Sequence, residues 1–498
     1  MNQLFQTKSI ERLMEQADEP EHRLKRLLGL WSLIGLGLGA VIGTGVWVLT
    51  GTAAAGETVA VPSMMKAPVL DLLLHGRDAV STFGRPGAGP GISLSYLLTA
   101  IVCGFAALCY AELASMIPIA GSAYTFTYAT LGELAAWIVG WNLILEYAVS
   151  NMAVAVGFSA YFNDIFDSLF GFQLPEMLSR PTMEAGAYSG AIFNLPAFLI
   201  LMILTMVLVR GVRESAQANN TMVVIKVAAI LMFVFGAARA IDPSNYQPFL
   251  PNGFQGLLTG SAIVFFTYIG FDSVSTAAEE CRNPQRDLPI GIVGTLGICA
   301  VLYVSVALVL TGIVNWKELG NAAPVVNALR VLGFDSIRQI VGVGAVVGMV
   351  SSLMVFQYGQ ARIWFAMSRD GLLPRMFSRV HPRHQTPHVS TWVAGLFVAI
   401  PAGVWDIGTF ADLASIGTLF AFAVVSAGVL ILRKTQPDRK RGFRVPWSPV
   451  TPWISIAACF LLMLGLPLET WIRFAVWLAM GLVIYWKFGM RHSEFARG

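Results

Sequence analysis

Charged residues are scarce in this sequence. They make up 12% of its 498 residues, about half of the roughly 25% that is typical of soluble proteins. Hydrophobic residues make up 56%, and the mean hydropathy is +0.66. Because so few charges cannot cover a water-facing surface, we expect most of the surface to face lipid.

Several motifs that would indicate other functions are also absent. The sequence has no Walker loop, which argues against an ATP-driven pump, and no nucleophile–base motif, which argues against an enzyme. No cofactor is expected. The few cysteines form no CxxC pair, so we expect small core residues rather than a disulfide framework; they are Cys103, Cys109, Cys281, Cys299 and Cys459.

Two polar segments could be taken for a metal site and a nucleic-acid-binding site, and we expect neither. The histidines of "HPRHQTPH" (His381, His384 and His388) have no cysteine or carboxylate close by, so we expect no metal site. The basic run "RKTQPDRKRGFR" at 433–444 is most simply a solvated cytoplasmic loop, with anionic lipid as a secondary partner and no nucleic acid.

Long apolar segments are abundant. A membrane-spanning helix needs about 20 mainly apolar residues, and twelve segments qualify: 28–52, 91–118, 134–164, 192–210, 221–242, 257–279, 288–314, 336–366, 389–405, 408–432, 450–466 and 469–487. The sequence therefore predicts an all-α membrane protein with 12 transmembrane helices.

The distribution of Lys and Arg predicts the orientation. If the N-terminus is cytoplasmic, 22 of the 33 lysines and arginines lie in cytoplasmic segments and 8 in outer loops. This bias follows the positive-inside rule. Residues 1–27 are polar and contain no apolar signal region. We therefore expect a multi-pass protein of the cell inner membrane with both termini in the cytoplasm.

The first apolar segment contains an unusual stretch, "GLGLGAVIGTGVWVLTG", from Gly35 to Gly51. A dinucleotide fingerprint would require a preceding strand and a βαβ unit, and neither is expected here. Glycines at every fourth position would allow close helix packing. The third reading is that the helix breaks at Ile42, Gly43, Thr44 and Gly45. Such a break in mid-membrane is tolerated only where it lines a cavity.

The sixth apolar segment supports the third reading. Ile269 and Gly270 lie 227 residues after Ile42 and Gly43, and Asp272 and Ser273 follow, where they would cap a second half-helix. Two interrupted helices, each opening a set of five spans, are typical of transporters built from inverted repeats.

Interrupted helices are suited to binding a zwitterion. The N-terminus of a half-helix attracts a carboxylate, and the carbonyls that end the other half attract an ammonium group. We therefore predict an amino acid substrate. Its carboxylate would bind the backbone of Thr44, Gly45 and Val46, and its ammonium would meet carbonyls near Ile42, Phe266 and Ile269. Aromatic residues would wall its side chain, namely Phe265, Phe266 and Tyr268.

Three stretches resemble a known family. "GAVIGTGVWVLTG", "CYAELASMIPIAGSAYTFTYATLGELAAWIVGWNLILEYAVS" and "GFDSVSTAAEECRNPQRDLPIGI" are similar to the amino acid–polyamine–organocation superfamily, in its bacterial cationic amino acid transporter branch. The resemblance implies the leucine-transporter fold, a 5+5 inverted repeat with two additional C-terminal helices. The expected parts are a cytoplasmic segment 1–27, repeats 28–242 and 257–432, two additional spans within 450–487, and a tail 488–498.

Ionisable residues inside apolar segments are candidates for function. In similar transporters, a lysine at the position of Lys226 is thought to carry the coupling proton. The alternative is a lysine that extends to the cytoplasmic edge of the membrane. Glu146 matches a family glutamate near the substrate, where it has either a structural role or one in recognition. We expect Glu112 and the pair Glu279–Glu280 to face Arg282 and Arg286 near the cytoplasmic ends.

One segment departs from the family pattern. About 25 additional residues, within 53–89, separate the first two spans on the outer side, and "APVLDLLLHG" would form a short surface helix there.

The whole sequence predicts a secondary active transporter that imports amino acids with protons by alternating access. The alternatives are an amino acid exchanger and a non-transporting amino acid sensor. Cationic and small neutral substrates both stay open, as does the oligomeric state.

Overall fold

The computed structural model describes residues 3–11, 14, 28–57, 63–76, 84–119, 121–172, 174–184, 187–210, 215–381 and 386–493, apart from the side chains of 3, 169, 215–218 and 279. Most of the predicted N-terminal segment 1–27, the end of the tail 488–498 and His384 therefore lie outside the described residues.

Eight helices in the described part of the chain are long and apolar enough to cross a membrane. They are centred on α5 (Ile92–Met116), α7 (Glu133–Phe170), α10 (Ser215–Ala237), α11 (Gly253–Val264), α13 (Pro284–Ile313), α15 (Asp335–Arg369), α17 (Ile407–Thr435) and α19 (Leu468–Ile484). A bent pair, α2 (Leu30–Val41) and η2–α3 (Gly45–Leu49 and Thr50–Ala55), qualifies as a ninth.

Three further apolar helices are shorter: α9 (Leu195–Arg210), α16 (His388–Ala402) and α18 (Val450–Leu464). Each of the twelve predicted apolar segments thus contains helix, which supports a helical membrane protein. The remaining described elements are the short helices α4 (Val69–His75), α6 (Ser122–Thr130), α8 (Glu176–Ser179), α12 (Ser273–Thr276), α14 (Pro324–Val331) and α20 (Met490–His492), several single turns, and two small hairpins.

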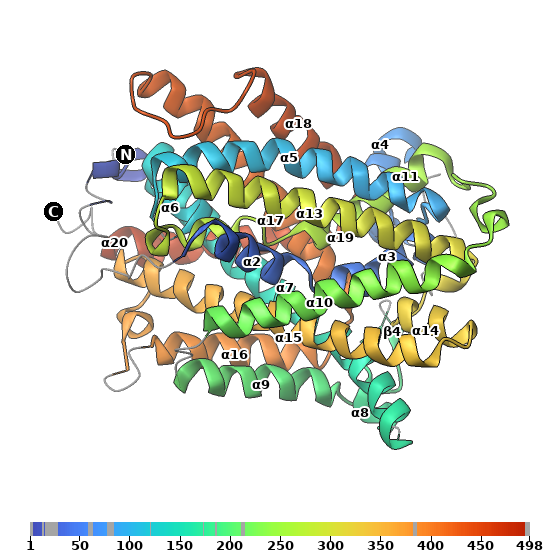
Figure 1. The fold of residues 1–498 in the computed structure, drawn as a ribbon. Helices are drawn as coiled ribbons and strands as arrows, with labels where there is room; N and C mark the ends of the chain where they lie inside the picture. Colours follow the sequence, from blue (N-terminus) through green and yellow to red (C-terminus); the bar gives the residue numbers. More distant parts are fainter. Residues whose placement is uncertain are drawn as a thin grey trace.

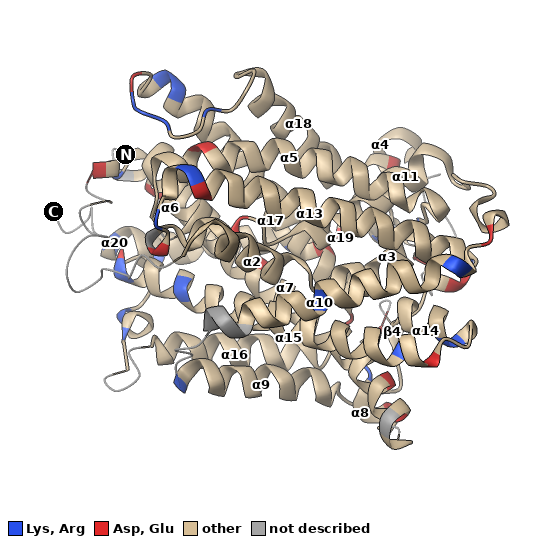
Figure 2. Ribbon diagram, in the orientation of Figure 1, with Lys and Arg blue, Asp and Glu red and all other residues tan. Residues whose placement is uncertain are grey.

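The long helices lie side by side along one direction (Figure 1). The first and last described helical turns, η1 (Gln3–Phe5) and α20, lie at the same end of this bundle. Lys, Arg, Asp and Glu gather towards the two ends, and the middle of the bundle carries few of them (Figure 2). This distribution is what a lipid-facing belt requires.

The packing places α2 in the interior. α13 packs along α5 and α2, while α7 packs along α15 and α17, and α10 lies against α15 and α2. Residues 33–35 and 37–50 are buried throughout. The interrupted helix is therefore surrounded by other helices rather than by lipid.

The additional segment between the first two spans returns to the bundle, with the Ala88 amide donating to the Ala53 carbonyl at 2.9 Å. The predicted surface helix is confirmed as α4. The strands β1 (Gly56–Glu57) and β2 (Arg85–Pro86) pair antiparallel and close the segment at its base. A second hairpin pairs β3 (Met183–Glu184) with β4 (Ala187–Tyr188). Residues 58–62 and 77–83 of the additional segment lie outside the described residues.

Candidate substrate site at two interrupted helices

The first break lies where the sequence predicts it. α2 ends at Val41, and Ile42 leaves the helical conformation with φ −80° and ψ 83°. The Gly43 amide turns back to the Val41 carbonyl at 2.9 Å. The chain then resumes as the π-helical turn η2 and α3, bent by 47° from α2. The break predicted at Ile42–Gly45 is thus confirmed.

The second break is also present. α11 tightens into the 3₁₀ turn η8 (Phe265–Tyr268), and Ile269 then adopts an extended conformation with ψ 136°. Gly270 has φ +111°, a conformation that residues with a side chain rarely adopt. Helix resumes only at α12. The predicted interruption at Ile269–Gly270 is therefore confirmed.

The two breaks lie against each other. A Cβ atom placed on Gly45 would be 2.8 Å from the Thr267 Cα, and one on Gly270 would be 3.0 Å from the Ala40 Cβ. Each glycine therefore allows the backbone of one interrupted helix to touch the other. This brings the predicted substrate residues of both helices to one place, and all eleven of them, Glu146 included, are buried.

The predicted carboxylate-binding backbone lies at the start of the second half of the first interrupted helix, where η2 begins. Among the described residues, the amides of Thr44, Gly45 and Val46 donate to no other segment of the chain. The Thr44 hydroxyl points away to the Val154 carbonyl on α7, at 3.2 Å. Only the backbone of this turn is therefore available to a substrate.

The predicted aromatic residues do not form one continuous wall, because Phe265 and Tyr268 pack against different helices. The Phe265 ring packs edge-on against Phe422 of α17. The Tyr268 ring packs against Tyr96 and Tyr303, and its hydroxyl donates to the Tyr96 carbonyl at 3.1 Å. Phe266 is the least buried of the three, at 5% exposure.

Lys226 of α10 binds the C-terminal end of α2. Its ammonium donates to the carbonyls of Gly39 and Ile42, both at 2.8 Å. The Ser352 hydroxyl of α15 lies 3.0 and 3.1 Å from the same two oxygens. Lys226 is fully buried, so the alternative of a lysine extending to the membrane edge is wrong. An ammonium at the C-terminal end of a helix also complements the partial negative charge there.

These contacts restrict the role predicted for Ile42. A carbonyl oxygen has two lone pairs, and in this structure Lys226 and Ser352 are both within hydrogen-bonding distance of the Ile42 oxygen. A substrate ammonium would have to displace one of them or bind to other carbonyls of the two breaks.

The predicted caps do not form in the expected way. Asp272 stands at the N-cap position of α12, but its side chain makes no capping hydrogen bond. Its carboxylate instead accepts from the Ser122 hydroxyl at 3.3 Å. The Ser273 hydroxyl donates backward to the Gly270 carbonyl at 2.5 Å. The reason is that α12 is only four residues long and is held by the preceding loop rather than by its own first turn.

Comparison with known proteins agrees with this geometry. The family model for amino acid permeases matches residues 28–485. The chain belongs to the amino acid permease family. It is 44% identical to the branched-chain amino acid permease BcaP of Bacillus subtilis, over 99% of this chain and 98% of the relative. It is 42% identical to the methylthioribose transporter of the same organism, over 99% of each.

A plant relative is more distant. The chloroplastic cationic amino acid transporter 9 of Arabidopsis thaliana is 36% identical over 88% of this permease and 72% of its own length. The family and these relatives are transporters, so this permease is not an enzyme.

Glu146 of the permease is buried beside the second break. It is 2% exposed, and among the described residues its Oε2 atom has no hydrogen-bond partner. Its carboxylate is close enough to that of Asp272 for the two charges to interact.

Tyr110 is a second buried polar residue near this break. It packs edge-on against Phe271, and its hydroxyl likewise has no hydrogen-bond partner among the described residues. Sequence reasoning missed Tyr110, since nothing local distinguishes it from other tyrosines.

Glu112 has partners other than the predicted ones. Its carboxylate accepts from Arg433 at 2.6 Å, from Arg441 at 3.1 Å and from the Val445 amide at 2.7 Å. The expected pairing of Glu112 with Arg282 or Arg286 is therefore wrong, because the last turn of α17 and the loop after it supply the partners of this carboxylate. Glu280 pairs with Arg362 at 3.5 Å.

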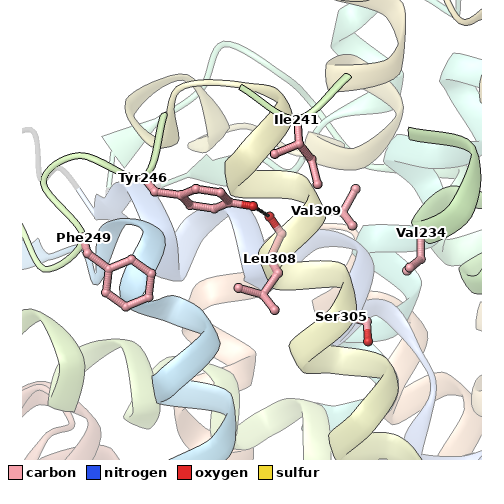
Figure 3. A pocket seen from close by; sticks show the side chains of 7 residues that line it. All are labelled: Val234, Ile241, Tyr246, Phe249, Ser305, Leu308 and Val309. Carbon is pink, nitrogen blue, oxygen red and sulfur yellow. Dashed lines mark hydrogen bonds between the residues drawn. The ribbon is translucent and has the colours of Figure 1, made fainter. Parts of the chain in front are cut away.

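An open groove of about 550 Å³ lies elsewhere on this permease, between α10 and α13 (Figure 3). Its lining is almost wholly apolar and contains none of the predicted site residues: Val234, Ile241, Tyr246, Phe249, Ser305, Leu308 and Val309. It therefore has no bearing on the substrate site. In the described part of the chain, no cluster of three His, Cys, Asp or Glu residues could hold a metal ion.

Proposed function

We propose that this permease imports amino acids across the bacterial inner membrane by alternating access, coupled to protons. The observation that carries the proposal is the contact between two interrupted helices in the middle of the bundle. Breaks of this kind lie at the substrate sites of many secondary transporters.

The backbone supports a zwitterionic substrate. The amides of Thr44, Gly45 and Val46 begin a continuous helical stretch of eleven residues, Gly45–Ala55. The partial positive charge at such an end favours a carboxylate. Carbonyls at the second break, near Phe266 and Ile269, and the buried carboxylate of Glu146 are available to an ammonium group. All these groups would bind the α-carboxylate and the α-ammonium group, which every amino acid shares.

For the side chain of the substrate, we propose a branched apolar group. BcaP, whose name states that class, matches this permease over nearly its whole length. The residues at the two breaks are mainly aliphatic or aromatic, which suits an apolar group. A cationic side chain would have to pair with Glu146 or Asp272, which are the carboxylates described next to the second break.

We further propose that Lys226 carries the coupling proton. As an ammonium it makes two hydrogen bonds to the end of α2. Hydrogen bonds from a charged donor contribute about 1.5–3 kcal/mol each. Loss of the proton would weaken both and loosen α2 from α10 and α15. Proton release would thereby favour movement of the inner half of the first helix.

We extend the proposal to the number of membrane crossings and the side on which the termini lie. We propose twelve crossings in a 5+5 inverted repeat with two additional C-terminal helices, and cytoplasmic termini. The bias of Lys and Arg supports this orientation. The position of η1 and α20 at one end of the bundle supports an even number of crossings (Figure 1).

Uptake by the purified permease in liposomes tests the proposal. Labelled leucine, isoleucine, valine, alanine, lysine and arginine would be offered with and without an inward proton gradient. We expect the branched-chain substrates to accumulate, and to do so faster with the gradient. Counterflow without any effect of the gradient would indicate the exchanger instead.

Methylthioribose is the second candidate substrate, because its transporter is 42% identical to this permease over the whole chain. That compound is a sugar without an α-carboxylate, so it would not use the amides of Thr44 to Val46 in the same way. Competition of unlabelled methylthioribose against leucine uptake separates the two. Strong inhibition by the sugar and weak inhibition by isoleucine would contradict the branched-chain proposal.

A further inference from the structure

Tyr96 of α5 is a fully buried residue that bonds to the first interrupted helix through its hydroxyl. This hydroxyl lies 2.6 Å from the Thr50 hydroxyl of α3. The Thr50 hydroxyl donates its one proton to the Val46 carbonyl at 2.8 Å, so Tyr96 must be the donor in the bond between the two hydroxyls. Through Thr50, Tyr96 therefore holds the turn η2, whose amides would bind the substrate carboxylate.

Tyr96 also bonds to the second interrupted helix. Its carbonyl accepts from the Tyr268 hydroxyl, at the end of η8, at 3.1 Å. Its own hydroxyl is close enough to the Thr267 side chain of the same turn to interact with it. The Tyr96 ring is packed between two other rings, with its centroid 6.1 Å from that of Tyr268 and 5.5 Å from that of Tyr303 on α13. One residue of α5 thus connects the two breaks.

The contact between the two breaks does not by itself fix their separation. Close packing at Gly45 and Gly270 prevents the two backbones from approaching further, but dispersion forces offer only weak resistance when they move apart. Among the described residues, no direct hydrogen bond joins residues 42–50 to residues 265–273. Hydrogen bonds through a third element must therefore hold the breaks together, and Tyr96 makes such bonds on both sides.

The separation of the breaks matters because they would bind opposite ends of one substrate. In the proposed site, the carboxylate binds the amides of η2 and the ammonium group binds at the second break. A β-amino acid has one more carbon between these two groups than an α-amino acid, which adds a bond of about 1.5 Å. A site that distinguishes the two classes must hold its two ends to a smaller tolerance, on the order of 0.5 Å.

We propose that Tyr96 is a positioning residue that makes the site selective for α-amino acids. It fixes the spacing between the amides of η2 and the second break. The proposal rests on the proposed function, since it requires the carboxylate and the ammonium group to bind at different breaks. Without the Tyr96 hydroxyl the breaks can separate, and a longer substrate then gains relative to a shorter one. Because Thr50 and Tyr96 lie in one chain of hydrogen bonds, loss of either hydroxyl releases the same constraint.

The experiment compares the binding of leucine with that of β-homoleucine, which keeps the isobutyl side chain and has one more carbon between the charged groups. Both affinities are measured by titration against the thermal stability of the purified permease in detergent. We expect the parent to prefer leucine. Y96F and T50V should each lower this preference about fivefold, the effect of one neutral hydrogen bond. The double variant Y96F/T50V should lower it no further than Y96F alone.

Two comparisons separate positioning from a general loss of packing. Thr50→Ser keeps the hydroxyl and should retain the preference that T50V loses. Tyr246 ends η7 (Pro243–Tyr246), and its hydroxyl donates to the Leu308 carbonyl of α13 at 2.8 Å (Figure 3). Y246F therefore removes a bond of the same kind that involves neither interrupted helix, and its preference should match that of the parent. The ratio of leucine to valine affinity should stay constant in Y96F, because both compounds are α-amino acids.

An undiminished preference for leucine in Y96F and T50V would overturn the proposal, as would an equal loss of preference in Y246F. If Y96F does not fold, T50V carries the test, because it removes the same link and leaves the three rings in place. A parent that binds neither compound refutes the proposed function and this selectivity together. A parent that prefers leucine, with variants that prefer it equally, refutes the role of Tyr96 alone.

Discussion

The contact between the two interrupted helices predicts a large effect of one methyl group. In Gly45→Ala, the new Cβ would lie 2.6 Å from the Thr267 Cγ2 and 2.8 Å from its Cα, whereas ordinary contacts begin at 3.4 Å. The methyl group is thus about 0.6–0.8 Å too close to both atoms. Because one of them is backbone, a change of rotamer cannot relieve the clash, and the two breaks must move apart.

The magnitude follows from measured costs of overpacking. Inserting a methyl group into a packed interior costs about 1–3 kcal/mol, which corresponds to a change of about 5- to 150-fold in an equilibrium. We expect G45A to weaken substrate binding by a factor in this range, since the amides of Thr44 and Gly45 would be displaced from the second break. Titration of leucine against thermal stability in detergent measures the affinity, and uptake in liposomes measures transport.

Two further variants make the test specific. Gly297→Ala places the same methyl group on α13, where nothing lies within 4 Å, so binding and uptake should stay at the parental level. Adding Thr267→Ser to G45A removes the 2.6 Å contact but leaves the one at 2.8 Å, so only part of the affinity should return. Parental affinity and uptake in G45A would refute the contact between the breaks.

Three other substitutions test the buried polar residues. In Lys226→Met, which keeps most of the side-chain volume, we expect leucine uptake that no longer responds to an inward proton gradient; an undiminished response would exclude Lys226 as the proton carrier. Ser352→Ala removes one hydroxyl proton that the carbonyls of Gly39 and Ile42 share, a neutral hydrogen bond of about 1 kcal/mol. Uptake should fall about fivefold with the response to the gradient retained, and a lost response would assign the coupling to Ser352 as well. Glu146→Gln keeps the shape of a side chain whose Oε2 has no partner among the described residues. Leucine uptake should weaken if this carboxylate binds the substrate ammonium, and unchanged Michaelis constants for leucine and lysine would leave it a structural role only.

Local chemistry explains which parts of the fold were predictable. The break at Ile42–Gly45 could be read from the sequence because glycines weaken a helix wherever they stand. The sixth span was harder, since its tightening to 3₁₀ over Phe265–Tyr268 involves no glycine and depends on packing against Gly45. The short helix α4 carries its own apolar pattern and was also predictable.

Pairing between distant residues was less accessible. Lys226 was a candidate from its place in an apolar span. Ser352, which donates to the same two carbonyls, was not, because an isolated serine in a helix has no distinctive context. Glu112 was assigned to the nearest arginines in the expected loops, whereas the fold brings Arg433 and Arg441 to it from more than 300 positions away. A single sequence contains no information on which of several compatible charges will meet.

The oxygens around Lys226 have a consequence for the ions that this permease can use. The carbonyls of Gly39 and Ile42 and the Ser352 hydroxyl form a small group of hard oxygen ligands, of the kind that a sodium ion binds. Here the Lys226 ammonium already donates to both carbonyls, and the Ser352 hydroxyl lies within hydrogen-bonding distance of the same oxygens, so a dissolved cation would have to displace the ammonium. Replacing sodium by potassium or choline in the medium should therefore leave uptake unchanged.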